Sequence, residues 1–133
     1  MSYEWIDEYC LSKKGVEKDY KLEWGAIRYM IRGKMFAMQG SDKMGEPIIT
    51  TKLEPSQGEF LRNKYKDIIP GYYMNKVHWN SLYLEGNVPD DIVKDMLDNA
   101  YALIFLSLSK KTQKEILEGV SLVQPERGIK FED

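Results

Sequence analysis

Residues 26–39, AIRYMIRGKMFAMQ, contain the clearest secondary-structure signal in the chain. Before the dipeptide Arg32-Gly33, the side chains of Ile27, Tyr29 and Ile31 share one face of an extended chain, and the apolar segment 34–39 follows as its partner. This dipeptide suits the tight turn of a β-hairpin, because glycine adopts positive φ without a steric penalty. We therefore predict an antiparallel hairpin with strands over 26–31 and 34–39.

The segment that precedes this hairpin is predicted to contain one helix and a loop. Residues 3–13 place apolar side chains at helical spacing, with acidic residues on the opposite side. Cys10 falls within the apolar set and is interpreted as a small buried hydrophobic residue. Gly15 is typical of a helix end. Residues 16–24 are mixed and charged, so we expect a loop there.

The segment that follows the hairpin predicts one more strand, then a helix, a second hairpin and a long helix. The β-branched residues of 47–52 favour a strand, and residues 54–65 favour a helix. Aromatic and aliphatic residues predict a hairpin with strands over 72–74 and 79–84. Residues 89–108 begin with Pro-Asp-Asp and have the strongest helical periodicity in the chain.

These elements follow one another in the order α-β-β-β-α-β-β-α. The strands occur in hairpins and do not alternate with helices, which predicts an α+β fold with an antiparallel sheet. We expect one domain over residues 1–111. Residues 112–133 should form a C-terminal extension, packed on that domain or trailing from it, with a short helix at 112–118 and a polar tail.

The composition excludes several classes of protein. The chain has 133 residues and a mass of 15.5 kDa, which suits one domain. Its net charge of −2 excludes a protein that coats polyanions by charge alone. A single cysteine rules out an intramolecular disulfide. The N-terminus shows no signal peptide, and the longest apolar run, Ala102–Leu106, is too short for a membrane span. We expect a cytoplasmic protein without a membrane association.

Motifs for catalysis and for cofactor or metal binding are missing from the sequence. There is no P-loop, no G-x-G-x-x-G, no G-x-S-x-G, no C-x-x-C and no H-E-x-x-H. His78 is the only histidine, which excludes mechanisms that need two imidazoles. Asp91, Asp95 and Asp98 are interpreted as a solvated helix face rather than a cation site. We therefore expect a non-enzymatic protein with no metal and no cofactor.

Charge is unevenly distributed along the chain. Residues 13–34 hold seven basic and three acidic side chains, and residues 61–79 hold four and one. Residues 85–98 hold one basic and five acidic side chains. Both predicted hairpins thus fall in basic segments, which allows their tips to lie against phosphates while an acidic face points away.

Residues 70–80 read PGYYMNKVHWN. This stretch resembles the P-G-Y-H-[ML]-N-K-x-H-W-N signature of the MmcQ/YjbR family. The sequence YCLS at 9–12 and GKMFA at 33–37 also resemble family blocks, as does VPD at 88–90. The resemblance covers roughly residues 5–111. It implies a small α+β fold of the secretion-chaperone or CyaY-like type, with two hairpin "wings" and a DNA-binding function.

Several signature residues have structural interpretations. Pro70 and Gly71 would give a sharp entry into a strand. Trp79 would supply a large buried area, and Asn80 would tie down a loop backbone. Asn75 is suited to a left-handed turn conformation. The signature residues that we interpret as structural are Pro70, Gly71, Tyr72, Asn75, Trp79 and Asn80.

The leading hypothesis is a non-enzymatic DNA-binding protein that contacts phosphates through its two hairpins. The candidate contact residues are Arg28, Arg32, Lys34, Lys76 and His78. One alternative is a protein-interaction or chaperone-like domain, which would bind a partner or a second copy through an exposed apolar face. Another is a small-ligand binder with an aromatic pocket lined by Tyr72, Tyr73, Trp79 and Tyr83. Whether the basic residues converge on one face decides between these hypotheses.

Overall fold

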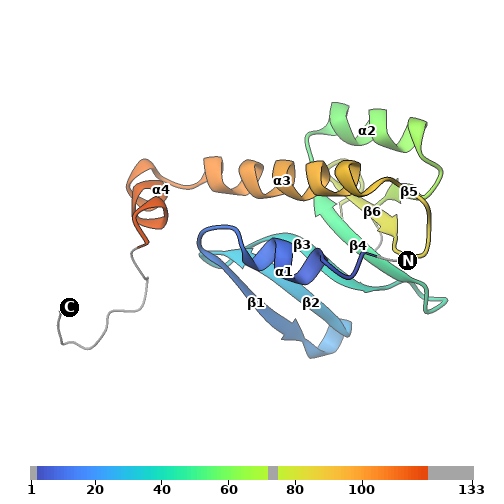
Figure 1. Ribbon diagram of the computed structural model, residues 1–133, viewed down its shortest axis with the longest axis horizontal. Helices are drawn as coiled ribbons and strands as arrows, with labels where there is room; N and C mark the ends of the chain where they lie inside the picture. Colours follow the sequence, from blue (N-terminus) through green and yellow to red (C-terminus); the bar gives the residue numbers. More distant parts are fainter. Residues whose placement is uncertain (1–2, 72–74, 120–133) are drawn as a thin grey trace.

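The computed structural model describes residues 3–71 and 75–119 (Figure 1). These residues form one six-stranded antiparallel sheet, with the strand order β1-β2-β3-β4-β6-β5. The strands are β1 (Val16–Lys21), β2 (Ala26–Ile31), β3 (Lys34–Ser41), β4 (Pro47–Lys52), β5 (Ile68–Pro70) and β6 (Trp79–Tyr83). The helices are α1 (Ile6–Leu11), α2 (Pro55–Lys64), α3 (Asp90–Ser107) and α4 (Lys110–Leu117), with a 3-10 turn η1 (Leu22–Trp24). The predicted α+β class and antiparallel sheet are confirmed.

The central hairpin β2–β3 forms as predicted. Arg32 and Gly33 both have positive φ, 49° and 82°, as a type I′ turn requires. The register then shifts: Tyr29 lies opposite Ala37, but Met30 lies opposite Met35. Phe36 is therefore the extra residue of a β-bulge. The bulge explains why the successive residues Phe36 and Ala37 are both buried in the core.

The predicted loop at 16–24 is wrong, because this segment forms β1 and η1. β1 is an edge strand, and four of its six residues are exposed. Charged side chains on an edge strand discourage pairing with another chain, so such a strand often lacks hydrophobic alternation. The charged side chains of β1 also form ion pairs: Asp19 pairs with Arg28 of β2, and Lys18 pairs with Asp7 of α1.

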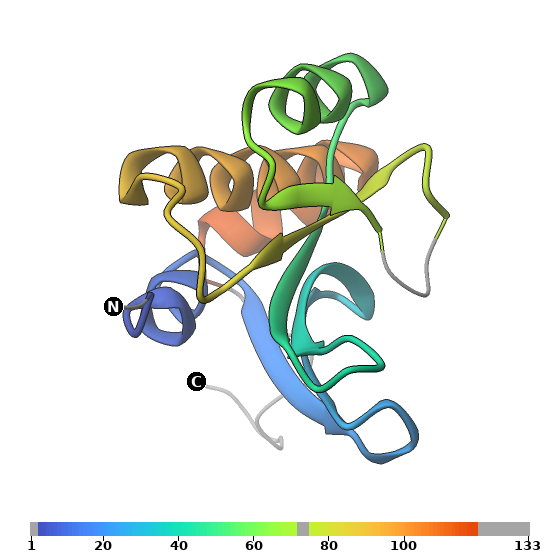
Figure 2. The ribbon, with the colours of Figure 1, turned by 90° about the vertical axis from the view of Figure 1, so that its right-hand side faces the viewer.

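The second hairpin begins earlier than predicted. β5 ends at Pro70, which pairs with Asn80 of β6. Proline is tolerated in β5 because this strand is the other edge of the sheet. The strand predicted over 72–74 lies outside the described residues. Figure 2 shows β5 and β6 beside α2.

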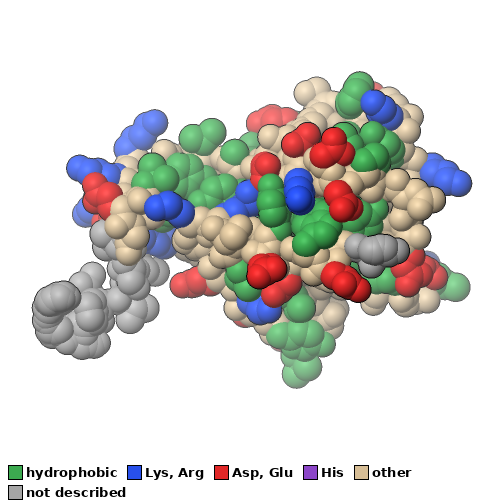
Figure 3. Space-filling view, viewed as in Figure 1, with side chains coloured by type: hydrophobic (Ala, Val, Ile, Leu, Met, Phe, Trp, Pro, Cys, Tyr) green, Lys and Arg blue, Asp and Glu red, His purple; other side chains and the backbone are tan. Residues whose placement is uncertain are grey.

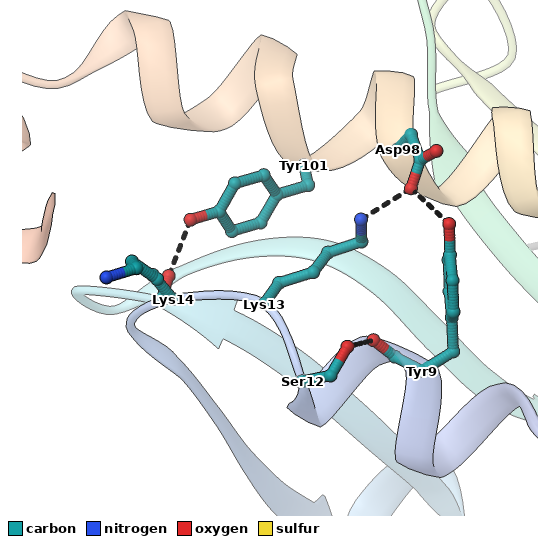
Figure 4. A network of polar contacts seen from close by, with 6 residues as sticks. All are labelled: Tyr9, Ser12, Lys13, Lys14, Asp98 and Tyr101. Atoms are coloured by element: carbon teal, nitrogen blue, oxygen red, sulfur yellow. Dashed lines mark hydrogen bonds and ion pairs between the residues drawn. The ribbon is translucent and has the colours of Figure 1, made fainter.

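α1 and α3 pack against the same face of the sheet. Their buried side chains share one core with the strands, and the long periodic segment is a helix as predicted. Tyr9 donates a hydrogen bond to Asp98 at 2.7 Å, and Lys13 pairs with the same carboxylate at 2.5 Å (Figure 4). Cys10 is fully buried, as expected.

α4 is the short helix that the sequence predicted in the extension. Ile116 is buried in the main core, and Glu115 pairs with Arg32 in the β2–β3 turn. α4 therefore lies against the same end of the molecule as that turn. The rest of the extension, 120–133, lies outside the described residues. Among the helices of the described ranges, none has the length and apolar character that crossing a membrane requires.

Candidate functional site

Arg28 is held by an acidic neighbour across the β1–β2 pairing. Its Nε and Nη2 atoms donate to the two carboxylate oxygens of Asp19, at 2.9 and 2.6 Å. The guanidinium also lies 5.8 Å from the centre of the Trp24 ring. The hydrogen bond from Arg28 holds the pKa of Asp19 below its usual value. Any phosphate contact by Arg28 must therefore compete with a bidentate ion pair.

Arg32 and Lys76 also have partners within the protein. Arg32 pairs with Glu115 of α4 at 3.3 Å. The Nζ atom of Lys76 donates to the main-chain oxygen of Gly71 at 2.8 Å, so this side chain closes the loop that precedes β6. Arg28, Arg32 and Lys76 are thus each engaged with a different part of the protein: β1, α4 and the loop before β6.

Lys34 and His78 do come together, in a pocket of about 310 Å³. Its other lining residues are Lys52 at the end of β4, Glu54 just beyond it, and three residues of the second half of α3. We call this the Lys34–His78 pocket, and its lining is Lys34, Lys52, Glu54, His78, Leu103, Ile104 and Ser107. Two of the five predicted contact residues are thus brought to one site.

Main-chain pairing places His78 in this pocket. β4 and β6 are paired as far as Lys52 and Trp79, and the pairing continues one step further because Leu53 N donates to His78 O at 2.8 Å. Lys52 and Glu54 flank Leu53, so both lie near His78. Lys34 opens β3, the strand that pairs with β4 on its other side.

The charges of the pocket favour an anion. Among the described residues, neither Lys34 nor Lys52 forms an ion pair with a carboxylate. Glu54 lines the pocket but lies beyond ion-pairing distance of both ammonium groups. Two unpaired ammonium groups beside an imidazole are donors suited to phosphate or carboxylate oxygens.

Sequence reasoning missed Lys52, Glu54 and Ser107. Lys52 is one lysine among many at the end of a strand, and Ser107 is an ordinary residue of a helix C-terminus. No local motif marks either residue. Lys52 comes near Lys34 and His78 because β4 pairs with both β3 and β6. This pairing exists only in the folded chain, so the local sequence could not reveal it.

Three residues of the family signature, Gly71, Trp79 and Asn80, pack and form hydrogen bonds next to His78. Gly71 N donates to Trp79 O at 2.6 Å, and a Cβ on Gly71 would lie 2.6 Å from Trp79 Cβ. Glycine is therefore required by close packing at this position. Asn80 is fully buried; its amide donates to His78 O at 3.4 Å and its Oδ1 accepts from Arg62 of α2. These contacts join Asn80 to the loop that precedes β6 and to α2.

Asn75 organises the turn that precedes β6. Its Oδ1 accepts a hydrogen bond from Val77 N at 2.7 Å, and its main-chain oxygen accepts from Trp79 N. The side chain of Asn75 therefore caps the turn. Tyr72 lies outside the described residues.

The surface over α4 is basic, whereas the surface over α1 and the first half of α3 is acidic. In Figure 3, Lys and Arg side chains gather over α4, while Asp and Glu predominate over α1 and the first half of α3. α4 contributes exposed lysines at 110, 111 and 114. α4 starts just after Ser107 of the pocket and is tied to the β2–β3 turn by Arg32. We call Lys34, Lys52, His78, Lys110, Lys111 and Lys114 the basic end.

Two other hollows bear on the alternative hypotheses. Tyr83 lines one hollow, whose charged lining residues are all acidic: Asp42, Glu46, Asp67 and Glu85. Tyr73 lies outside the described residues, as Tyr72 does. Trp24 lines the second, beside the exposed side chains of Leu22 and Tyr20 at the tip of the β1–β2 hairpin. No group of three or more potential metal ligands occurs in the part of the chain that the structure describes.

Comparison with known proteins identifies the family. The YjbR family model matches residues 11–103. Protein YjbR of Escherichia coli K12 is 28% identical over 111 residues, which cover 84% of this chain and 93% of that protein. Protein YbdF of Escherichia coli O157:H7 is 33% identical over 68% of this chain and 74% of its own.

A solved structure shares the fold. The crystal structure of Deinococcus radiodurans protein DR2400 superposes with a TM-score of 0.76 and 23% identity, over 95% of this chain and 93% of the other. The matched family segment contains the residues of the Lys34–His78 pocket up to Leu103. The sequence resemblance is therefore confirmed, and the chain belongs to the YjbR family.

Proposed function

We propose that this protein is a non-enzymatic, cytoplasmic nucleic-acid-binding domain that contacts DNA phosphates through its basic end. The observation that carries the proposal is the convergence of Lys34, Lys52 and His78 on one pocket. The ammonium groups of Lys34 and Lys52 have no carboxylate partner among the described residues. Unpaired cations of this kind gain more from a phosphate than cations that must first leave an ion pair.

The separation of charge supports the same proposal. A net charge of −2 is compatible with DNA binding when the acidic side chains lie apart from α4, as they do over α1 and the first half of α3. The basic end then faces the polyanion, and the acidic face over α1 points away from it. Arg28 and Arg32 are secondary contacts in this arrangement, because Asp19 and Glu115 already neutralise them.

The test is a salt titration of binding to a duplex oligonucleotide, followed by fluorescence anisotropy. The slope of log K against log salt is expected to be negative, at about −0.9 per phosphate neutralised. The double variant K34A/K52A should lower its magnitude by about 1.8, because two phosphate contacts are lost. K64A/K66A removes the same charge from the α2 region, outside the basic end, and should leave the slope unchanged. Binding that is insensitive to salt, or equal slopes for both variants, contradicts the proposal.

A protein-interaction domain is the second candidate, and the apolar tip of the β1–β2 hairpin favours it. At this tip the exposed fractions of Leu22, Tyr20 and Trp24 are 79%, 60% and 49%. Large exposed apolar side chains of this kind are common at protein interfaces. Sedimentation of the wild-type chain and of L22D would test self-association. A monomer at all concentrations, together with strong DNA binding, would favour the first proposal.

A further inference from the structure

The Lys34–His78 pocket has a composition that is more specific than a surface for backbone phosphates. One part carries the ammonium groups of Lys34 and Lys52 and the imidazole of His78. Another part is an apolar wall made by Leu103 and Ile104 of α3. A carboxylate from Glu54 completes the lining, and the Ser107 hydroxyl is engaged with Ile104 O at 2.6 Å.

The size of the pocket limits which phosphate fits. A volume of about 310 Å³ lies at the lower end of the range for small-molecule sites, roughly 300 to 1,000 Å³. An internal phosphodiester has sugars on both sides, so the strand would have to enter such a pocket and leave it again. A phosphate monoester has one substituent and three terminal oxygens, and carries about −1.5 to −2 charge at pH 7. Three adjacent donors suit those three oxygens.

Glu54 and the apolar wall point to an organic group attached to that phosphate. A carboxylate is unfavourable in a site for a bare inorganic anion, because it repels the ligand. It is favourable when the ligand also offers a hydroxyl or amino donor, which a carboxylate accepts. Leu103 and Ile104 provide a surface on which the non-polar part of a sugar or base would pack.

We infer that the Lys34–His78 pocket binds a terminal phosphate monoester joined to a hydroxyl-bearing or amino-bearing group, as in a mononucleotide or at the 5′-phosphorylated end of a nucleic-acid strand. Lys34, Lys52 and His78 bind the phosphate oxygens, and Glu54 accepts a hydrogen bond from the attached group. This inference rests on the proposed function and on the same pocket. It goes further because it names the ligand: a phosphate that has three free oxygens, unlike an internal phosphodiester.

The decisive experiment compares one oligonucleotide with and without its 5′-phosphate, using the full chain. We expect the phosphorylated form to bind about tenfold more tightly, as one or two charge-assisted hydrogen bonds would give. K34Q and K52Q should each abolish this preference, whereas K64Q, outside the pocket, should keep it. E54Q should retain the preference for the phosphate but weaken binding of adenosine monophosphate relative to inorganic phosphate.

His78 provides an independent readout. It is the only histidine of the chain, so its imidazole protons give an unambiguous proton NMR signal. Adenosine monophosphate should shift that signal, and adenosine, which lacks the phosphate, should not. Inorganic phosphate should shift it only at higher concentration. A shift with adenosine monophosphate but no preference for a 5′-phosphorylated strand would identify a free nucleotide as the ligand.

The two proposals fail in different ways. Equal affinity for 5′-phosphorylated and 5′-hydroxyl strands, with an unmoved His78 signal, overturns this inference and leaves salt-dependent duplex binding intact. A preference for the 5′-phosphate that survives in both K34Q and K52Q also overturns it, because the site then lies elsewhere. The absence of any salt-dependent binding to DNA overturns the proposed function, whereas the mononucleotide titration still tests the pocket.

Discussion

The main-chain oxygen of His78 accepts a hydrogen bond from the main-chain nitrogen of Leu53 at 2.8 Å. This bond lies beyond the last paired residues of β4 and β6, and it holds His78 opposite the segment that carries Lys52 and Glu54. Backbone pairing therefore organises this part of the pocket: Lys34 and Lys52 project from the ends of interior strands, and His78 is held to the sheet by a main-chain hydrogen bond. The predictions below address this arrangement and the packing that supports it.

Asn80 should be important for both stability and the position of His78. Replacing it by alanine removes an acceptor from Arg62 and a donor to His78 O, in a fully buried position. We expect N80A to lower the free energy of unfolding by about 1–3 kcal/mol, measured by urea denaturation. Asn63 on α2 is exposed, so N63A is the matched control and should have little effect. Equal stability of the two variants would contradict the role assigned to Asn80.

Gly71 should not accept a larger side chain. A Cβ at this position would lie 2.6 Å from Trp79 Cβ and 2.8 Å from Trp79 O. We expect G71A to cost about 1–3 kcal/mol of folding free energy, because the strand and loop must separate. Thermal unfolding measures this cost. Gly45 has open space around it but a φ of +85°, so G45A should cost about 1 kcal/mol from backbone strain alone. A G71A variant as stable as wild type would refute close packing here.

Asp19 should restrain the contribution of Arg28 to DNA binding. Because Asp19 forms a bidentate pair with Arg28, R28A is expected to weaken DNA binding less than K34A does. D19N releases the guanidinium and should increase the magnitude of the salt slope by about 0.9, the value of one further phosphate contact. Anisotropy titrations at several salt concentrations measure both effects. If R28A is the more damaging substitution, the interface is centred on the sheet and away from the pocket.

Ionisation of buried groups near α1 should destabilise the protein at high pH. Burial raises the pKa of the Cys10 thiol to about 12 and that of Tyr9 to about 12, and it also raises the pKa of Tyr29. Their neutral forms are favoured in the folded state. The stability they contribute is present below the unfolded-state values of 9.0 and 10.0 and is lost as the pH rises from there toward 12.

Two measurements check this effect. The free energy of unfolding in urea should be constant near pH 8 and should fall between about pH 9 and pH 11. At pH 8 the folded protein should not react with a thiol reagent, while the unfolded chain reacts at once, because only the thiolate is nucleophilic. Rapid modification of the native protein at pH 8 would contradict the burial of Cys10.

Local sequence signals predicted the elements that have strong local patterns. The β2–β3 turn at Arg32-Gly33 requires positive φ, and the periodicity of α3 follows from its one buried face; both are properties of neighbouring residues. β1 and β5 were missed or misplaced because they are edge strands, whose sequences are adapted to solvent and to pairing with distant residues.

The sequence by itself determined the fold class, the family and the identity of the residues that can bind an anion. Only the tertiary structure decided which of them are available. Arg28, Arg32 and Lys34 have similar charges and lie within one hairpin, yet Asp19 and Glu115 neutralise the first two. Lys34 instead meets Lys52 and His78 in one pocket. Charge is a property of each residue, whereas pairing with a carboxylate or convergence on a ligand depends on strand register and helix packing.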